Sequence, residues 1–348
     1  MLYFNNDYNE CCHSAILERL QQLTGVQLPG YGTDAICQEA KAIIRKLCGR
    51  EDAAVHFLVG GTQTNLTVIA ASLRPYQAVV AADSGHIHVH ETGAIEAVGH
   101  KIIALPSADG KITGEQILRE ITSGAYVLDP EHTVQPKQVY ISHPTEVGTL
   151  YTLEELKQIR KVCDQQGMTL FVDGARLGYG LTASDTDVTL QDLAALADVF
   201  YIGGTKVGAM FGEAVVITNP CIEEGFRHMM KQKGGMLAKG WLLGVQFQVL
   251  LEDGLYFRIA KEANRQADRI RQTLKELGVP FFMETTANQV FPILPNTVLS
   301  KLEKEFTFAC WEMIDKDHTA VRFCTSWATR PEDTEALCAG LKAACNNA

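Results

Sequence analysis

The stretch DVFYIGGTKVGAMFGEAVVI, residues 198–217, places a single lysine between two apolar runs that are typical of buried strands. Lysine is seldom buried without a partner, because removing an ammonium group from water is costly. Lys206 follows the first run on a glycine-rich turn and has small residues on both sides. A charge in this place needs a functional explanation.

Apolar strands and amphipathic helices alternate through most of the chain around this stretch. The segments that read as strands are 55–61, 78–83, 101–106, 138–144, 168–174, 198–204 and 212–218, and those that read as helices include 35–48, 63–73 and 153–167. This alternation predicts an α/β fold with a mainly parallel sheet covered by helices on both faces. We expect an N-terminal segment at 1–20, a large domain at 21–245 and a small C-terminal α+β domain at 246–348.

The composition narrows the class of protein. The 348 residues are 46% apolar and 21% charged, and the formal net charge is -10. An acidic chain without long basic runs is not expected to bind nucleic acid or anionic membranes as its main function. No apolar run approaches the roughly 18 residues that span a bilayer, and the N-terminus does not resemble a secretory signal. The ten cysteines contain no C-x-x-C pair, which favours a reducing cytoplasm.

Three reactive-looking groups come directly after predicted parallel strands. They are Gly60-Gly61-Thr62, Asp173 and, 33 positions later, Lys206. Ligands bind at the carboxyl ends of such strands, so these groups are expected to meet. A glycine turn before a helix suits a phosphate, although a plain tight turn is the alternative, and Asp173 could instead pair with Arg176. A lysine that forms a Schiff base, an aspartate for a pyridinium nitrogen and a phosphate loop together predict pyridoxal 5′-phosphate.

The run His86-Ile87-His88-Val89-His90 raises the alternative of a metal site. A strand would place all three imidazoles on one face. The following segment, ETGAIEAVGH (91–100), favours the start of a helix, which brings only His86 and His90 near each other. No other cluster of ligands supports a metal, and we predict none.

Several motifs resemble those of the low-specificity L-threonine aldolases. This group belongs to the β-eliminating lyases, which are pyridoxal-phosphate enzymes with the aspartate aminotransferase fold (fold type I). The motifs that carry the resemblance are Asn6-Asp7-Tyr8, Gly30-Tyr31-Gly32, Gly60-Gly61-Thr62, His86 to Glu91, Thr145-Glu146-Val147-Gly148, Val172-Asp173-Gly174-Ala175-Arg176, Gly203-Gly204-Thr205-Lys206 and Arg322 in VRFCTSWAT. The aspartate and lysine motifs are specific, and the others are individually modest.

The resemblance implies a role for each of these positions. Lys206, in a motif with Thr205, would bind the cofactor covalently, and Asp173 would meet the pyridine nitrogen. The phosphate loop would comprise Gly61, Thr62 and Gln63, and His86 would stack on the ring. The substrate carboxylate would be held by Arg176 and Arg322 with help from Asn6. Tyr31 would come from a neighbouring subunit, which implies a homodimer or homotetramer with shared active sites.

The implied activity is retro-aldol cleavage of threonine or a related β-hydroxy-α-amino acid to glycine and an aldehyde. The catalytic base stays open between a water held by His86 and Glu91 and a histidine such as His143. Leu237 replaces an arginine that contacts phosphate in some relatives, so Lys233 or Lys239 are candidates for that contact. The alternatives are a β-eliminating lyase or racemase on the same scaffold, and a cofactor-binding protein without turnover.

Overall fold

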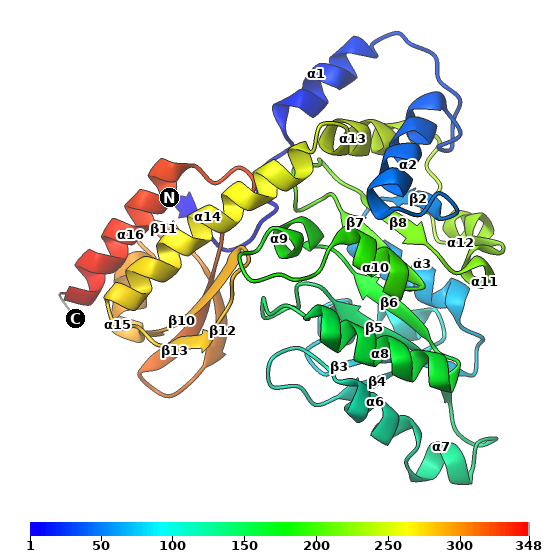
Figure 1. Ribbon diagram of the computed structural model, residues 1–348. Coiled ribbons are helices and arrows are strands. Elements are labelled where there is room, and N and C mark those ends of the chain that lie inside the picture. Colours follow the sequence, from blue (N-terminus) through cyan, green and yellow to red (C-terminus); the bar gives the residue numbers. More distant parts are fainter. Residues whose placement is uncertain (347–348) are drawn as a thin grey trace.

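A seven-stranded sheet forms the centre of the molecule in the computed structural model, which describes residues 1–346 (Figure 1). From one edge to the other its strands are β2 (Ala54–Leu58), β8 (Glu213–Ile217), β7 (Val199–Gly203), β6 (Thr169–Asp173), β5 (Gln135–Ser142), β3 (Gln77–Ala82) and β4 (Lys101–Leu105). The pairs from β7 to β4 are parallel, while β8 is antiparallel to both β7 and β2. Two reversals leave β2 pointing the same way as β7. The predicted mainly parallel sheet is confirmed.

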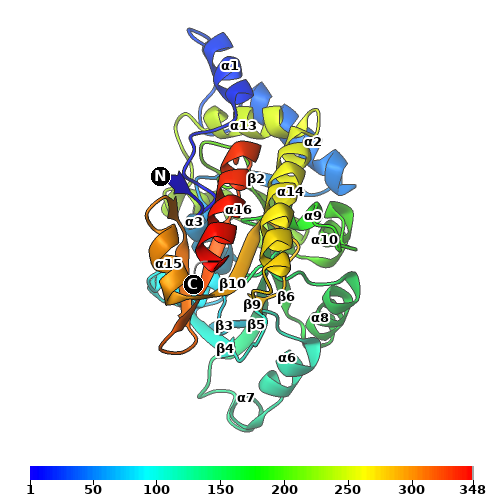
Figure 2. The same ribbon diagram turned by 90° about the vertical axis from the view of Figure 1, so that its left-hand side faces the viewer.

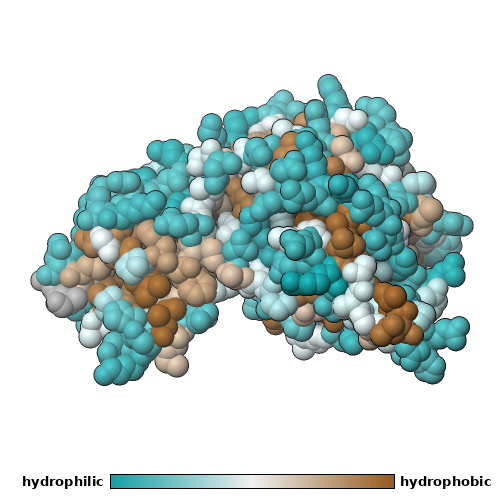
Figure 3. All heavy atoms as spheres, turned by 60° about the horizontal axis from the view of Figure 1, so that its bottom comes forward, coloured by the Kyte–Doolittle hydropathy of each residue, from teal (hydrophilic) through white to brown (hydrophobic). Residues whose placement is uncertain are grey.

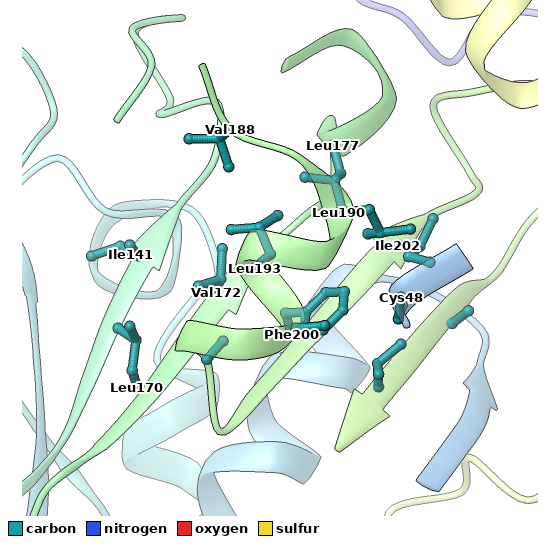
Figure 4. Packing of buried hydrophobic residues seen from close by; sticks show 14 of the residues in the cluster. Cys48, Ile141, Leu170, Val172, Leu177, Val188, Leu190, Leu193, Phe200 and Ile202 are labelled. Atoms are coloured by element: carbon teal, nitrogen blue, oxygen red, sulfur yellow. The ribbon is translucent and has the colours of Figure 1, made fainter. Parts of the chain in front are cut away.

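Helices cover both faces of this sheet. They are α2 (Ala35–Cys48), α3 (Gly61–Ser72), α4 (His86–Val89), α5 (Ala94–Ala97), α6 (Gly114–Ile121), α7 (Gly124–Leu128), α8 (Leu153–Gln166), α9 (Leu177–Leu181), α10 (Leu190–Leu196), α11 (Pro220–Glu223), α12 (Phe226–Gln232) and α13 (Trp241–Leu251). Side chains alternate between the two faces along a strand. Accordingly, Phe200 packs in one core beneath α10 (Figure 4). Its neighbour Tyr201 packs in the core on the other face.

A smaller α+β unit completes the chain. Its antiparallel sheet has the order β12 (Ala309–Met313), β13 (His318–Cys324), β10 (Gln289–Pro295) and β9 (Phe281–Met283). Its helices are α14 (Leu255–Glu276), α15 (Asn296–Leu302) and α16 (Pro331–Asn346), and β1 (Leu2–Tyr3) adds a parallel pairing with β11 (Phe306–Thr307). In Figure 2, α14 and α16 lie side by side, and α1 (Ser14–Gln22) projects from the upper end.

The expected limits of the domains differ from where the packing changes. A boundary after residue 245 falls inside α13, whose Leu243 and Phe247 both belong to the core of the large domain. The change occurs within α14 instead, since Ala263 packs in the large core and Ala267 in the small one. The first twenty residues are also divided between the two units. β1 pairs with β11 in the small unit, whereas Ile16 packs in the core of the large domain.

The surface agrees with this division into two units. Figure 3 shows a smaller and a larger lobe, with hydrophilic residues over most of this face and hydrophobic residues in separate patches. Within residues 1–346, no helix combines the length and the apolar character needed to cross a bilayer.

Candidate active site

A cavity of about 620 Å³ lies where the strands of the large domain end. The large domain contributes the ends of β2, β5, β6 and β7 with their following loops, and the small unit contributes Ala309, Cys310, Trp311 and Arg322. The groups that we expected to meet, Gly60-Gly61-Thr62, Asp173 and Lys206, all line it. The parallel topology explains this meeting, because these residues follow strands that point the same way.

Lys206 is held on the turn between β7 and β8. Its backbone carbonyl accepts a hydrogen bond of 2.5 Å from the Tyr179 hydroxyl. Glu213, at the start of β8, supports the turn by accepting hydrogen bonds from the Gly204 amide at 3.1 Å and the Thr205 hydroxyl at 2.8 Å. Burial lowers the pKa of Lys206, and the charge of Arg176 lowers it further. A lysine of lowered pKa is suited to act as a nucleophile toward a carbonyl group.

Asp173 is fixed at the end of β6 by three donors. Its Oδ2 accepts hydrogen bonds from the Tyr140 hydroxyl at 2.6 Å and the Asn65 amide at 3.0 Å, and its Oδ1 accepts one from the Ala175 amide at 2.9 Å. Burial opposes ionisation, but the charge of His86 and the bond from Tyr140 bring the pKa of Asp173 below its ordinary value. Asp173 is therefore an ionised carboxylate facing a cavity, and its side chain does not pair with Arg176.

The glycine turn opens α3 without a side-chain cap. Gly60 is the N-cap, so the first amides of the helix, at Gly61, Thr62 and Gln63, have no capping oxygen. Free amides at a helix N-terminus favour an anion. The Gln63 side chain is turned away from the cavity. It accepts a hydrogen bond from the Val59 amide at 3.2 Å and donates one to the Lys233 carbonyl at 3.1 Å. The backbone amide is thus what Gln63 offers to a phosphate.

His86 lines the cavity and is tied to two carboxyl groups. Its Nδ1 lies 2.8 Å from Glu91 Oε1, and its backbone amide donates to Glu146 Oε1 at 2.9 Å. Burial lowers the pKa of His86, but Glu91 and Asp173 together raise it above its ordinary value. Glu91 is buried behind His86 and also accepts a hydrogen bond from Asn65 at 2.7 Å. The ring of His90 lies 5.5 Å from that of His86, as a helical start at His86 predicts.

Two arginines face the cavity from opposite units. Asp7, fully buried, accepts hydrogen bonds from Arg176 Nε at 2.7 Å and Nη2 at 2.9 Å. Burial disfavours the charged form of Asp7, yet the charge of Arg176 lowers the pKa of Asp7 to about 2. Arg322 donates to the Asn5 carbonyl and lies 5.6 Å from the Trp311 ring, while its buried Nε has no partner within residues 1–346. Both guanidinium groups can still meet an anion.

Besides Gln63 and Glu91, five candidate residues do not line this cavity, namely Asn6, Tyr31, His143, Lys233 and Lys239. The Lys233 carbonyl accepts the hydrogen bond from Gln63 described above. The side-chain oxygen of Asn6 accepts a hydrogen bond from the Tyr8 amide. Tyr31 is exposed, has a left-handed φ of 61° and lies under Lys231 in a separate small recess. Lys239 lines a third hollow beside α1. His143 is completely buried, with burial lowering its pKa to about 4 and no partner for either ring nitrogen among residues 1–346.

Further polar groups at the site were not predicted from the sequence. They are Asp7, Asn65, Tyr140, Glu146 and Glu213. Asp7 and Glu146 belong to motifs that carry the resemblance, and Asn65 lies in the predicted helix 63–73. Tyr140 and Glu213 are embedded in apolar strands and carry no signal of their own. No three His, Cys, Asp or Glu side chains within residues 1–346 are grouped so as to hold a metal ion.

Known proteins resemble this chain in sequence and in fold. Residues 20–296 match the model of the family described as beta-eliminating lyase. A low-specificity L-threonine aldolase from Pseudomonas sp. is 31% identical over 323 residues, which are 90% of this chain and 89% of that protein. A solved threonine aldolase from Leishmania major is 43% identical, with a TM-score of 0.95 over 99% of this chain and 100% of that one. An aspartate aminotransferase from Thermus thermophilus, 14% identical with a TM-score of 0.71 over 99% of this chain and 91% of its own, shares the fold. The chain belongs to the β-eliminating lyase family.

Proposed function

We propose that this protein uses pyridoxal 5′-phosphate to cleave threonine, or a related β-hydroxy-α-amino acid, to glycine and an aldehyde. The observation that carries the proposal is the placement of Lys206, Asp173 and the open N-terminus of α3 around one cavity. The relatives named as threonine aldolases support the choice of reaction. The ten free cysteines support a reducing cytoplasm as the location.

The residues fit the cofactor at three separate points. A carbon atom added at Gly60 would meet nothing within 4 Å, so the turn leaves room for a phosphate against the free amides of α3. The carboxylate of Asp173 faces the same cavity and would keep a ring nitrogen protonated, since opposite charges favour each other's charged form. Lys206 supplies an amine of lowered pKa for the cofactor aldehyde.

Protein side chains supply orientation and control of protons. The chemistry that pyridoxal phosphate provides when bound is uptake of the electron pair left at Cα as a bond to that carbon breaks. Arg322 and the free edge of Arg176 line the cavity and would hold the substrate carboxylate, and this contact would fix which bond at Cα is aligned for cleavage. His86 forms one wall of the cavity, where it would lie against the cofactor ring.

The experiment that tests this function compares products from two substrates. Purified protein with pyridoxal phosphate should convert L-threonine to equal amounts of glycine and acetaldehyde. Pyruvate and ammonia from L-serine or L-cysteine, without glycine from threonine, would indicate β-elimination, and loss of stereochemistry alone would indicate a racemase. Lys206→Ala should abolish turnover, whereas Lys304→Ala, an exposed lysine far along the chain, should not. Absence of turnover on all these substrates would contradict the proposal.

A further inference from the structure

Of the three carboxyl groups among residues 1–346 whose side chains line the cavity, only that of Glu146 has an oxygen without a hydrogen bond. It lies in the loop after β5 and is 9% exposed. Its Oε1 accepts hydrogen bonds from the Ser142 hydroxyl at 2.6 Å and from the His86 amide at 2.9 Å. Its Oε2 has no hydrogen bond within residues 1–346, and the side chain lines the cavity. One oxygen is thus anchored while the other is available to a ligand.

The other two carboxyl groups that line the cavity are already engaged. Both oxygens of Asp173 accept hydrogen bonds, and its lowered pKa makes it a weak base. Both oxygens of Glu213 are held by the turn that carries Lys206. Neither can take a proton from a substrate without breaking contacts that support the site.

Two histidines, His86 and His90, also line the cavity and are the rival proton acceptors. His86 has a raised pKa because of Glu91 and Asp173, which favours the protonated ring. His90 is exposed as a whole, but partial removal of its ring from water and the charge of His86 lower its pKa, which weakens it as a base. Burial acts on Glu146 in the opposite sense and raises its pKa, and a base is most effective when its pKa approaches the working pH.

We propose that Glu146 Oε2 is the catalytic group that accepts the proton of the substrate β-hydroxyl. This inference rests on the proposed cleavage reaction. The hydroxyl proton moves to Oε2, and the O–H electron pair becomes the second C–O bond of the aldehyde. The Cα–Cβ bond breaks, and its electron pair stays with the glycine half of the substrate. One proton is then added at Cα, so that glycine and the aldehyde together contain every atom of the substrate.

Hydrogen bonding behind the cavity explains why this oxygen is well placed. Ser142 Oγ lies 2.6 Å from Glu146 and 3.3 Å from the Tyr140 hydroxyl, which in turn donates to Asp173. Asn65 bonds both Asp173 and Glu91, and Glu91 contacts His86, whose amide returns to Glu146. This closed ring of hydrogen bonds holds Glu146 through Oε1, so that Oε2 needs no reorganisation to meet a substrate.

The test separates cleavage from a reaction that needs no β-hydroxyl. In Glu146→Gln, the amide oxygen can keep the bonds to Ser142 and His86, while the other atom can no longer accept a proton. We expect kcat/KM for L-threonine cleavage to fall about 100-fold or more. Exchange of the glycine α-proton in D2O, followed by NMR, and the affinity for glycine, followed by absorbance titration, should change by less than about threefold. Glu155→Gln, which alters a carboxylate paired with Lys111 outside the site, should leave all three unchanged.

Each contrary outcome has a distinct meaning. Wild-type protein that cleaves neither L-threonine nor L-allo-threonine contradicts the proposed function itself. Wild-type cleavage that persists in Glu146→Gln overturns the role of Glu146 alone, and so does an equal loss of cleavage, exchange and glycine affinity. If His90→Gln alone loses threonine cleavage while Glu146→Gln cleaves threonine at the normal rate, the proton goes to His90. That result also overturns the role of Glu146. If the Gln variant folds poorly, Glu146→Asp, which withdraws the carboxyl from the cavity, is judged by the same assays.

Discussion

At the scale of single residues, Arg176 is oriented before any substrate arrives. The forked guanidinium group of Arg176 donates two hydrogen bonds to Asp7. The Asn288 side-chain amide donates a third to Asp7 at 3.0 Å. The motif containing Asp7 could be recognised in the sequence, but the choice of Asn6 as the contributing residue rested on resemblance alone. The pairing could not be predicted, because it joins residues 169 positions apart.

Asp7→Asn should weaken folding in a pH-dependent way. Breaking a buried ion pair costs about 3 kcal/mol, so the free energy of unfolding should fall by that order at pH 7. The folded pKa of Asp7, about 2, lies below its ordinary value of 3.8. The stabilisation is therefore present above pH 3.8 and is lost as the pH falls toward 2. Urea unfolding of both proteins over a pH series measures the difference. Asp317→Asn, at an exposed site, is the control, and equal midpoints for Asp7→Asn and wild type would contradict the prediction.

Asp173→Asn should lower turnover by orders of magnitude while the fold persists. An amide can accept the hydrogen bond from Tyr140, but it carries no charge to keep a ring nitrogen protonated. The measurements are kcat on threonine and the far-ultraviolet circular dichroism spectrum. A folded variant with nearly normal kcat would show that Asp173 does not serve the ring.

At the scale of elements, all seven strands of the central sheet and the long helices α2, α3 and α8 could be predicted. Strands buried on both faces are continuous apolar runs, and α8 carries a capping box at Thr152 and a left-handed Gly167 at its end. The reversal of β8 could not be predicted, because a buried strand has the same pattern in either direction. The two-residue β1 and the transition between cores within α14 depend on tertiary packing and leave no periodic signal.

Packing of α13 on α2 depends on the absence of a side chain at Gly244. A Cβ there would lie 2.9 Å from Cα of Cys37, so one helix would have to move. Gly244→Ala should lower the free energy of unfolding by about 1–3 kcal/mol, although alanine favours helices. Gly124→Ala, where a Cβ meets nothing within 4 Å, should be neutral or stabilising. Denaturant unfolding compares the two variants, and equal midpoints would refute the close contact.

At the scale of the whole molecule, the site lies between two units and leaves Tyr31 remote from Lys206. Tyr31 sits on an exposed loop beside Lys231 and Arg227, in a left-handed conformation that a tyrosine seldom adopts. The resemblance assigns Tyr31 to an active site, and its place outside the cavity of its own chain favours the site of a neighbouring chain. We therefore propose a dimer, or a dimer of dimers, with shared sites.

Mixing two inactive variants tests this arrangement. Tyr31→Ala and Lys206→Ala chains, produced together so that they exchange, should regain part of the wild-type activity, because some hybrid dimers carry one site with both residues. Each variant expressed alone is the control. If exchange is demonstrated and Tyr31→Ala is strongly impaired, then hybrids without recovery would mean that both residues act within one chain.

Borohydride reduction shows which lysine forms the Schiff base with the cofactor. Protein loaded with pyridoxal phosphate should be yellow, lose its long-wavelength absorbance band on reduction, and carry the phosphopyridoxyl group on the peptide containing Lys206. Lys206→Ala should bind no cofactor covalently, even if the open end of α3 still holds the phosphate. A reduced adduct on another lysine of the wild-type protein, or none at all, would contradict the assignment of Lys206 as the Schiff-base lysine.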